Sequence, residues 1–157
     1  MIRPIQLSDN KELANIIRRN LEAHNVALPG TVYTDPTTDN LFELFKTEGS
    51  VYFVLVEENK VLGGCGIFPT EGLPEGHVEL VKLYLSDEAK GKGFGRKLME
   101  MSIEWAKAQG ASHIYLETFD ELASAVKLYK KLGFYPLNAP LGHSGHHACT
   151  IWMLKEV

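Results

Sequence analysis

The chain has 157 residues, of which 45% are hydrophobic and 23% are charged, and its net charge is −4. These values are ordinary for a soluble globular protein, and the length is enough for one domain with a sizeable core. The negative net charge and the absence of a long basic run argue against bulk binding to nucleic acid or to an anionic membrane. We therefore expect a single domain over residues 1–157.

The longest apolar run, Val51 to Val56, is far too short to cross a membrane, and Met1 to Gln6 have no apolar region of the secretory type. Cys65 and Cys149 are the only cysteines, and neither has a partner at metal-ligand spacing. Free thiols in a reducing compartment are the simplest interpretation, so we expect a cytoplasmic protein.

The N-terminal half predicts a strand, two helices, a loop and a hairpin. Asp9 followed by Glu12 is typical of a helix N-cap pair, and Asn25–Thr38 is predicted to be a loop because it holds prolines, a glycine and threonines. The hairpin turns at residues 58–59. The predicted elements are a strand over Met1–Leu7, helices over 10–20 and 39–46, and strands over Ser50–Glu57 and Lys60–Pro69.

The C-terminal half alternates strands and helices. Gly110 suits the C-cap of the main helix, Asp120 is predicted to cap the next helix, and Gly133 to end it. Apolar residues at helical spacing predict the buried stripe of the main helix, namely Phe94, Leu98, Met101, Trp105 and Ala108. The predicted elements are a strand over His77–Leu85, a helix over Gly93–Gln109, and strands over His113–Thr118, Phe134–Leu137 and Ala148–Lys155. This order predicts an α/β protein with a mixed central sheet and helices on both faces.

Residues 77–96 are the most informative segment, because an alternating strand runs into a basic, glycine-rich loop and then into an amphipathic helix. Such a loop leaves backbone N–H groups unpaired at a helix N-terminus, where the helix dipole adds positive potential and a phosphate or pyrophosphate can bind. The loop has no dinucleotide Gly-x-Gly-x-x-Gly spacing, because Arg96 occupies the last position, and no nucleotide P-loop sequence occurs. A flexible turn remains the alternative.

Two motifs together resemble those of the GNAT acetyltransferases. Lys90-Gly-Lys-Gly-Phe-Gly95 is similar to the family's Arg/Gln-x-x-Gly-x-Gly/Ala loop, whose amides hold the pyrophosphate of acetyl-CoA. Ser124-Ala-Val-Lys-Leu-Tyr-Lys-Lys-Leu-Gly-Phe134 resembles the second motif, Ala-x-x-Leu-Tyr-x-x-x-Gly-Phe, in the expected order and separation. The resemblance is clearest from Val51 to Phe134. Two positions depart from the pattern: Lys90 replaces Arg or Gln and loses the bidentate fork, and Leu122 replaces an Asn that contacts the cofactor.

The resemblance implies acetyl-CoA as the cosubstrate. In relatives the strand before the loop splays from its neighbour, so that backbone amides such as those of Leu83 and Leu85 pair with the pantetheine arm. Ser124, or backbone, is expected to supply the contact that Leu122 cannot make. The implied cofactor-binding residues are Leu83, Tyr84, Leu85, Lys90, Gly91, Lys92, Gly93, Phe94, Gly95, Arg96 and Ser124.

Acetyl transfer to an amine needs a base that removes a proton from the acceptor ammonium, and the leaving thiolate benefits from an acid. Glu79 matches the spacing of a catalytic glutamate in some relatives. Alternation places it on one strand face with Val81, Leu83 and Leu85, where apolar surroundings would raise its pKa. Tyr129 matches the family tyrosine beside the cofactor sulfur and is the candidate acid. The alternative for Glu79 is a glutamate at a strand end that pairs with a nearby lysine, with water or another residue acting as the base. The alternative for Tyr129 is a helix tyrosine packed in the core.

Residues 142–149 contain His143, His146, His147 and Cys149. Adjacent His146 and His147 point to opposite sides of an extended chain, so we expect no metal site. The segment joins the last two strands, and in this fold that position lies near the acceptor pocket. We therefore expect one of the three histidines to contact the acceptor or to relay a proton; surface histidines on an ordinary hairpin are the alternative.

The sequence thus predicts an enzyme that transfers an acetyl group from acetyl-CoA to the primary amine of a small molecule, by direct attack in a ternary complex. No cysteine is expected at the junction of cofactor and acceptor, which argues against an acetyl-enzyme. The alternatives are acetylation of a peptide or protein amine, and a non-catalytic sensor that binds acyl-CoA. Neither nucleic acid nor a membrane is expected as a partner, and the resemblance implies a homodimer as one possible assembly.

Overall fold

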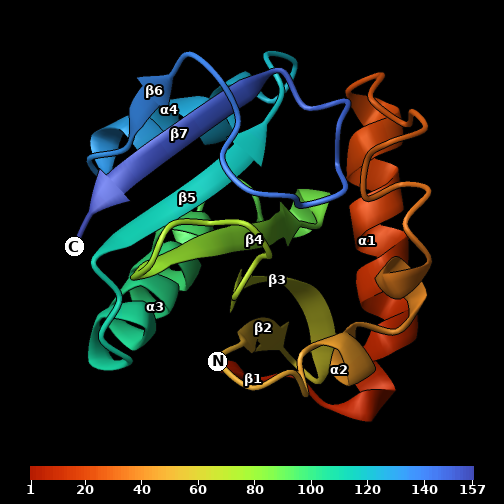
Figure 1. The fold of residues 1–157 in the computed structure, drawn as a ribbon. Helices are drawn as coiled ribbons and strands as arrows, with labels where there is room; N and C mark the ends of the chain where they lie inside the picture. The colour runs from red at the N-terminus through yellow and green to blue at the C-terminus, as the bar shows by residue number, and fades with distance from the viewer.

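The computed structural model describes residues 1–157, which form a seven-stranded sheet in the order β1-β2-β3-β4-β5-β7-β6 with helices on both faces (Figure 1). The strands are β1 Ile2–Pro4, β2 Val51–Glu57, β3 Lys60–Phe68, β4 His77–Leu85, β5 His113–Thr118, β6 Tyr135–Leu137 and β7 Ile151–Glu156. The helices are α1 Asn10–Ala23, α2 Leu41–Leu44, α3 Phe94–Ala108 and α4 Ala123–Lys131, with short 3-10 turns at Leu7–Asp9, Pro36–Asp39 and Asp87–Ala89. The predicted fold class and order of strands and helices are confirmed.

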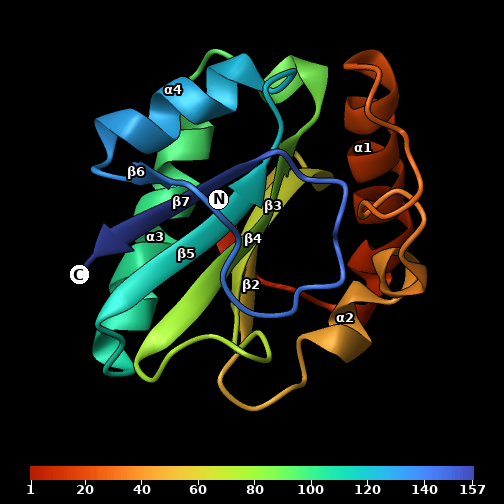
Figure 2. The ribbon, with the colours of Figure 1, turned by 45° about the horizontal axis from the view of Figure 1, so that its top comes forward.

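The sheet separates two apolar cores, one on each face. Helix α1 covers one face, while α3 and α4 cover the other (Figure 2). The α1 core includes Leu13, Ile17, Leu21, Tyr52 and Val54, all buried. The core under α3 and α4 includes Leu55, Cys65, Ile67, Leu98, Met99 and Ile103. No helix has the length and apolar character that a membrane-crossing segment requires.

Strands β4 and β5 form the sheet's parallel pair, and the pairing is short. It joins residues 77–79 to residues 113–115 and ends at Glu79 and Tyr115. Past that point β5 continues to pair with β7 as far as Thr118, whereas β4 continues with β3 as far as Leu85. The edge of β4 that faces β5 therefore has no strand partner after Glu79, and the two strands diverge.

A β-bulge at Lys82 interrupts β4. The register with β3 shifts between Gly64 and Gly66, Lys82 has a positive φ of 54°, and the Tyr52 hydroxyl donates a hydrogen bond to the Lys82 carbonyl oxygen at 2.8 Å. An extra residue reverses the alternation of side chains after the bulge. The prediction that Glu79 shares one face with Val81, Leu83 and Leu85 is therefore wrong in part. Val81 packs with the α1 core, and Leu83 and Leu85 with the core on the opposite face.

Asp9 occupies the N-cap position of α1 as predicted but makes no capping hydrogen bond with its side chain, and the predicted cap Asp120 is wrong. The buried Asp9 carboxylate instead forms an ion pair with Arg3 at 2.8 Å and accepts a hydrogen bond from the backbone N–H of Gln6. Helix α4 begins at Ala123 behind Leu122 rather than behind Asp120. The first strand is also shorter than predicted, because residues 7–9 form a 3-10 turn, and the last strand begins at Ile151.

The predicted buried stripe of α3 is displaced around the helix. Met101 is 38% exposed and Ala108 is exposed, whereas Leu98, Met99, Ser102, Ile103 and Ala106 are buried. Ser102 is the reason that the pattern misleads, because a polar residue occupies the centre of the buried face. Its hydroxyl donates to the Leu98 carbonyl oxygen at 2.9 Å, which satisfies it inside the core.

Candidate active site

A cavity of about 560 Å³ lies where β4 and β5 diverge. Its lining comes from both strands, the glycine-rich loop, the start of α4, residues of α1 and the loop after it, and the segment before β7. Its volume is typical of a small-molecule site. It brings together most of the predicted site residues: Glu79, Leu83, Tyr84, Leu85, Lys90, Gly91, Gly93, Gly95, Arg96, Ser124, Tyr129 and His146. Lys92, Phe94, His143 and His147 are not part of the lining.

The glycine-rich loop forms one end of the cavity at the N-terminus of α3. Gly91 and Gly93 have φ angles of 75° and 82°, a conformation that costs other residues about 1–2 kcal/mol. A Cβ at Gly93 would meet no protein atom within 4 Å, so the space in front of the loop is open. Lys90 and Arg96 add positive charge, although each also pairs with a nearby carboxylate. This end suits a phosphate group.

Glu79 lies on the side of the cavity away from that loop and is 4% exposed. Burial raises the pKa of its carboxyl to about 7, and the nearby charge of Glu117 adds to the effect. A hydrogen bond from the Thr70 hydroxyl, at 2.6 Å, and the charge of Lys82 act in the opposite direction. No ion pair joins Glu79 to Lys82. A carboxyl group with this pKa can both accept and release a proton at neutral pH.

Tyr129 comes from α4, lines the cavity and is 7% exposed. Its ring packs against Phe134 with 6.1 Å between the centroids, and burial raises the pKa of its hydroxyl above the ordinary value. The hydroxyl is therefore protonated at neutral pH and is available as an acid. Leu122 and Ser124 line the cavity at the start of the same helix.

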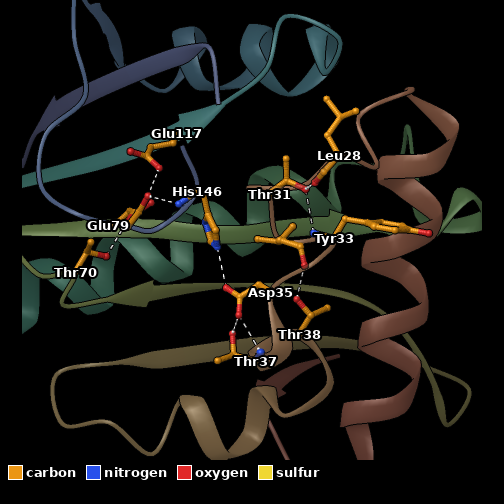
Figure 3. A network of polar contacts seen from close by, with 12 residues as sticks. Leu28, Thr31, Tyr33, Asp35, Thr37, Thr38, Thr70, Glu79, Glu117 and His146 are labelled. Atoms are coloured by element: carbon orange, nitrogen blue, oxygen red, sulfur yellow. Dashed lines mark hydrogen bonds and ion pairs between the residues drawn. The ribbon is translucent and has the colours of Figure 1, made fainter. Parts of the chain in front are cut away.

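Two loops that are distant in the sequence meet at the Glu79 end of the cavity (Figure 3). His146 Nε2 lies 2.9 Å from Asp35 Oδ2, and the Ala148 N–H donates to the Gly30 carbonyl oxygen at 3.2 Å. Burial raises the pKa of Asp35, but hydrogen bonds from His146 and Thr37 outweigh it and lower the value to about 2. Because Asp35 is ionised, His146 Nε2 is the donor of this hydrogen bond.

Glu117 on β5 is tied into the same network. Tyr115 donates its hydroxyl to Glu117 Oε2 at 2.7 Å, and the Ser144 hydroxyl donates to Oε1. The backbone N–H of His146 in turn donates to Ser144 Oγ at 3.1 Å. Figure 3 shows Glu79, Glu117 and His146, which come from three different segments, with the His146 ring directed toward Asp35.

Sequence reasoning did not identify Asp35, Glu117 or Thr70. Asp35 precedes Pro-Thr-Thr and accepts from the Thr37 N–H at 2.9 Å, so its local pattern indicates a turn rather than a site. Glu117 carries a usable signal, because a carboxylate within a strand that leads to the second motif is unusual. Thr70 acts only through its contact with Glu79, and nothing in the sequence joins the two.

The three histidines diverge. His146 reaches the cavity, the ring of His147 packs against Gly30, and the ring of His143 packs against Gly72. Their roles toward an acceptor stay predictions.

Cys149 lines the cavity, which corrects the expectation that no cysteine lies near the junction of cofactor and acceptor. Burial raises the pKa of its thiol to about 12, and the charges of Glu117 and Glu79 add to the effect. The reactive form of cysteine is the thiolate. Cys149 is therefore a poor nucleophile at neutral pH despite its position.

Comparison with known proteins agrees with this geometry. The model of the acetyltransferase (GNAT) family matches residues 13–134. The N-acetyltransferase YjgM of Escherichia coli is 36% identical over 158 aligned positions, which cover all of this chain and 95% of that protein. The fold is similar to that of a GNAT acetyltransferase from Staphylococcus aureus Mu50, with a TM-score of 0.86, 20% identity, and 99% and 98% of the two chains covered. PaiA N-acetyltransferase from Thermoplasma acidophilum, solved with coenzyme A, has a TM-score of 0.77 at 16% identity, over 100% and 98% of the chains.

Proposed function

The chain belongs to the GNAT acetyltransferase family, and we propose that it acetylates the primary amine of a small molecule with acetyl-CoA, by direct attack in a ternary complex. Residues 1–157 act as one catalytic unit in this proposal. The observation that carries it is the cavity itself, which joins a phosphate-binding loop to a buried carboxyl group whose pKa is about 7. A protein that only bound acyl-CoA would have no need of such a base.

The residues present fit acetyl-CoA. The left-handed Gly91 and Gly93 and the N-terminus of α3 offer backbone amides to the pyrophosphate. The edge of β4 at Leu83 can pair with the amides of the pantetheine arm, because no strand occupies that edge, and at Leu85 the backbone N–H is left for this pairing since the carbonyl oxygen accepts from Asn20 Nδ2 at 2.8 Å. Apolar side chains line the same cavity, among them Leu83, Leu85 and Leu128.

The acid and base have complementary ionisation. Acetyl-CoA supplies the thioester whose carbonyl carbon the neutral amine attacks. Glu79 accepts the proton that the acceptor ammonium must lose, and Tyr129 donates its proton to the departing thiolate sulfur. Burial raises the pKa of Glu79 to about 7 and the pKa of Tyr129 above its ordinary value. Glu79 therefore exchanges protons near neutral pH, while Tyr129 stays protonated.

A small acceptor is favoured over a peptide or protein by the two joined loops. The hydrogen bonds between His146 and Asp35 and between Ala148 and Gly30 link the segment before β7 to the loop after α1. A protein substrate would need an open channel across this end of the cavity, and the joined loops narrow the opening of the cavity there. A small amine needs only the enclosed space.

The test is release of CoA from acetyl-CoA with a panel of small amines, amino acids and N-terminal peptides, together with calorimetry of acetyl-CoA binding. We expect turnover with at least one small amine and none with peptides longer than a few residues. Preferential turnover of peptides would favour the protein acetyltransferase. Binding of acetyl-CoA without turnover of any amine would favour the sensor and refute the proposal.

A further inference from the structure

One charged side chain at the acceptor end of the cavity lacks a partner. Three carboxylates near it accept hydrogen bonds: Asp35 from His146 and Thr37, Glu79 from Thr70, and Glu117 from Tyr115 and Ser144. Lys82 lines the same cavity, but its ammonium group forms neither an ion pair nor a hydrogen bond with the protein.

The β-bulge places Lys82 in the cavity and strains the backbone there. In a regular strand, residues 79 and 82 would face opposite sides of the sheet. The bulge brings Lys82 back to the side of Glu79, and both Glu79 and Asp35 are close enough to act on its charge. A positive φ in a residue other than glycine is uncommon and strained, and such strain collects at ligand-binding positions.

The surroundings of the ammonium are also unfavourable for a charge. Burial lowers the pKa of Lys82, and only the more distant charges of Asp35 and Glu79 counter this effect. Lys82 is half-buried, and a cation in a partly desolvated cavity gains from a partner that supplies hydrogen bonds. A carboxylate oxygen of a bound ligand would supply that partner and would form a charge-assisted hydrogen bond.

We infer that Lys82 binds a carboxylate on the acceptor, so that the acceptor is a free amino acid or a similar small aminocarboxylate. The inference rests on the proposed function, since it assigns the second half of the same acceptor site. Glu79 lies three residues from Lys82 and receives the amino group. One small molecule can then place its ammonium at Glu79 and its carboxylate at Lys82.

A competing role for Lys82 is electrostatic only. Its charge lowers the pKa of Glu79, so it could act solely by adjusting the base. That role would affect every acceptor equally. Carboxylate binding affects only those acceptors that carry the anion, and this difference decides between the two roles.

The experiment compares amino acids with their carboxamides, which match in shape but lack the negative charge. Values of kcat/KM for CoA release are measured for each acid and amide with the wild type, Lys82→Met and Lys82→Gln, and thermal melting confirms that each variant folds. Lys90→Met is the matched control, because Lys90 lines the loop end of the same cavity. Carboxamides lose their amine proton more readily than the acids, so chemical reactivity alone would favour the amides.

We expect the wild type to prefer acids over amides by about 10- to 100-fold, the range of a hydrogen bond to a charged group. Lys82→Met and Lys82→Gln should abolish this preference, and Lys90→Met should preserve it while raising the KM for acetyl-CoA. Equal use of acids and amides by the wild type would overturn the inference without any variant. An unchanged preference in the folded Lys82 variants, or an equal loss for acids and amides, would overturn it as well. If no amine at all releases CoA, the proposed function itself fails.

Discussion

Replacing Glu79 with Gln should have opposite effects on activity and stability. Gln is nearly isosteric and can still accept the hydrogen bond from Thr70, which is 2.6 Å long in the native protein. It cannot ionise, however, so it can neither act as a base nor be destabilised by burial of a negative charge. The activity should fall by about 10²–10⁴-fold, the usual contribution of a general base.

The gain in stability follows from the pKa. In the unfolded chain the carboxyl has its ordinary value of 4.5, and in the folded protein burial raises the pKa of Glu79 to about 7. The folded state binds the proton more tightly, so as the pH rises from about 4.5 to 7 the unfolded state ionises first and the native protein loses stability. Above pH 7 the full difference of about 2.5 pKa units applies, which corresponds to about 3 kcal/mol. Glu79→Gln removes this destabilisation.

Thermal melting of both proteins at pH 5 and pH 8 measures the effect. At pH 8 the variant should melt about 6–12 °C higher than the wild type, since 1 kcal/mol corresponds to about 2–4 °C for a chain of this size. At pH 5 the gain should fall below about 1 kcal/mol. In the wild type, kcat/KM should rise with pH and level off above about 7, whereas the variant should lack this rise. An activity loss below about threefold, or a variant that melts lower at pH 8, would refute the reasoning.

Three further predictions concern Thr70, which contacts Glu79, and two residues that line the cavity, Gly93 and Tyr129. Thr70→Val should shift the rise of kcat/KM to higher pH, because it removes the hydrogen bond that lowers the pKa of Glu79. Gly93→Ala should weaken acetyl-CoA binding in calorimetry at least tenfold, whereas Gly110→Ala, with a similar φ at the other end of α3, should cost about the same 1–2 kcal/mol of stability and leave binding intact. Tyr129→Phe should slow turnover but spare acetyl-CoA affinity, and a thioester with a more acidic thiol should reduce the loss; equal losses with both donors would contradict an acid role.

The fold was largely predictable because hydrophobic periodicity and glycine positions are local signals. The strand His113–Thr118 has the predicted bounds, and Gly110 and Gly133 follow the ends of α3 and α4 with positive φ angles. The errors arose where a tertiary contact overrides the local pattern. The Asp9 carboxylate pairs with Arg3 instead of capping a helix, and Ser102 can be buried because its hydroxyl donates a hydrogen bond to the Leu98 carbonyl oxygen.

The residues of the candidate site were predictable only where they lie within one motif or one continuous segment. Gly91, Gly93 and Tyr129 lie in the motifs, and the structure places all three along one cavity. The acceptor side depends instead on contacts across the sequence, such as the hydrogen bond between Asp35 and His146, which are separated by 111 residues. Neither residue has a local pattern that indicates the other, so no reading of the sequence alone could have paired them.

The bulge in β4 explains how one strand can serve both substrates. Before it, Glu79 points to the acceptor side; after it, Leu83 and Leu85 turn to the core under α3 and α4, next to the glycine-rich loop. A regular strand would have placed Leu83 and Leu85 on the same face as Glu79 and Lys82 on the opposite face. The extra residue at Lys82 therefore does two things at once: it directs the apolar side chains toward the cofactor end, and it keeps a cation beside the base. Since Gly64 and Gly66 lie opposite the shift, the sequence of β3 accommodates the distortion that the site requires.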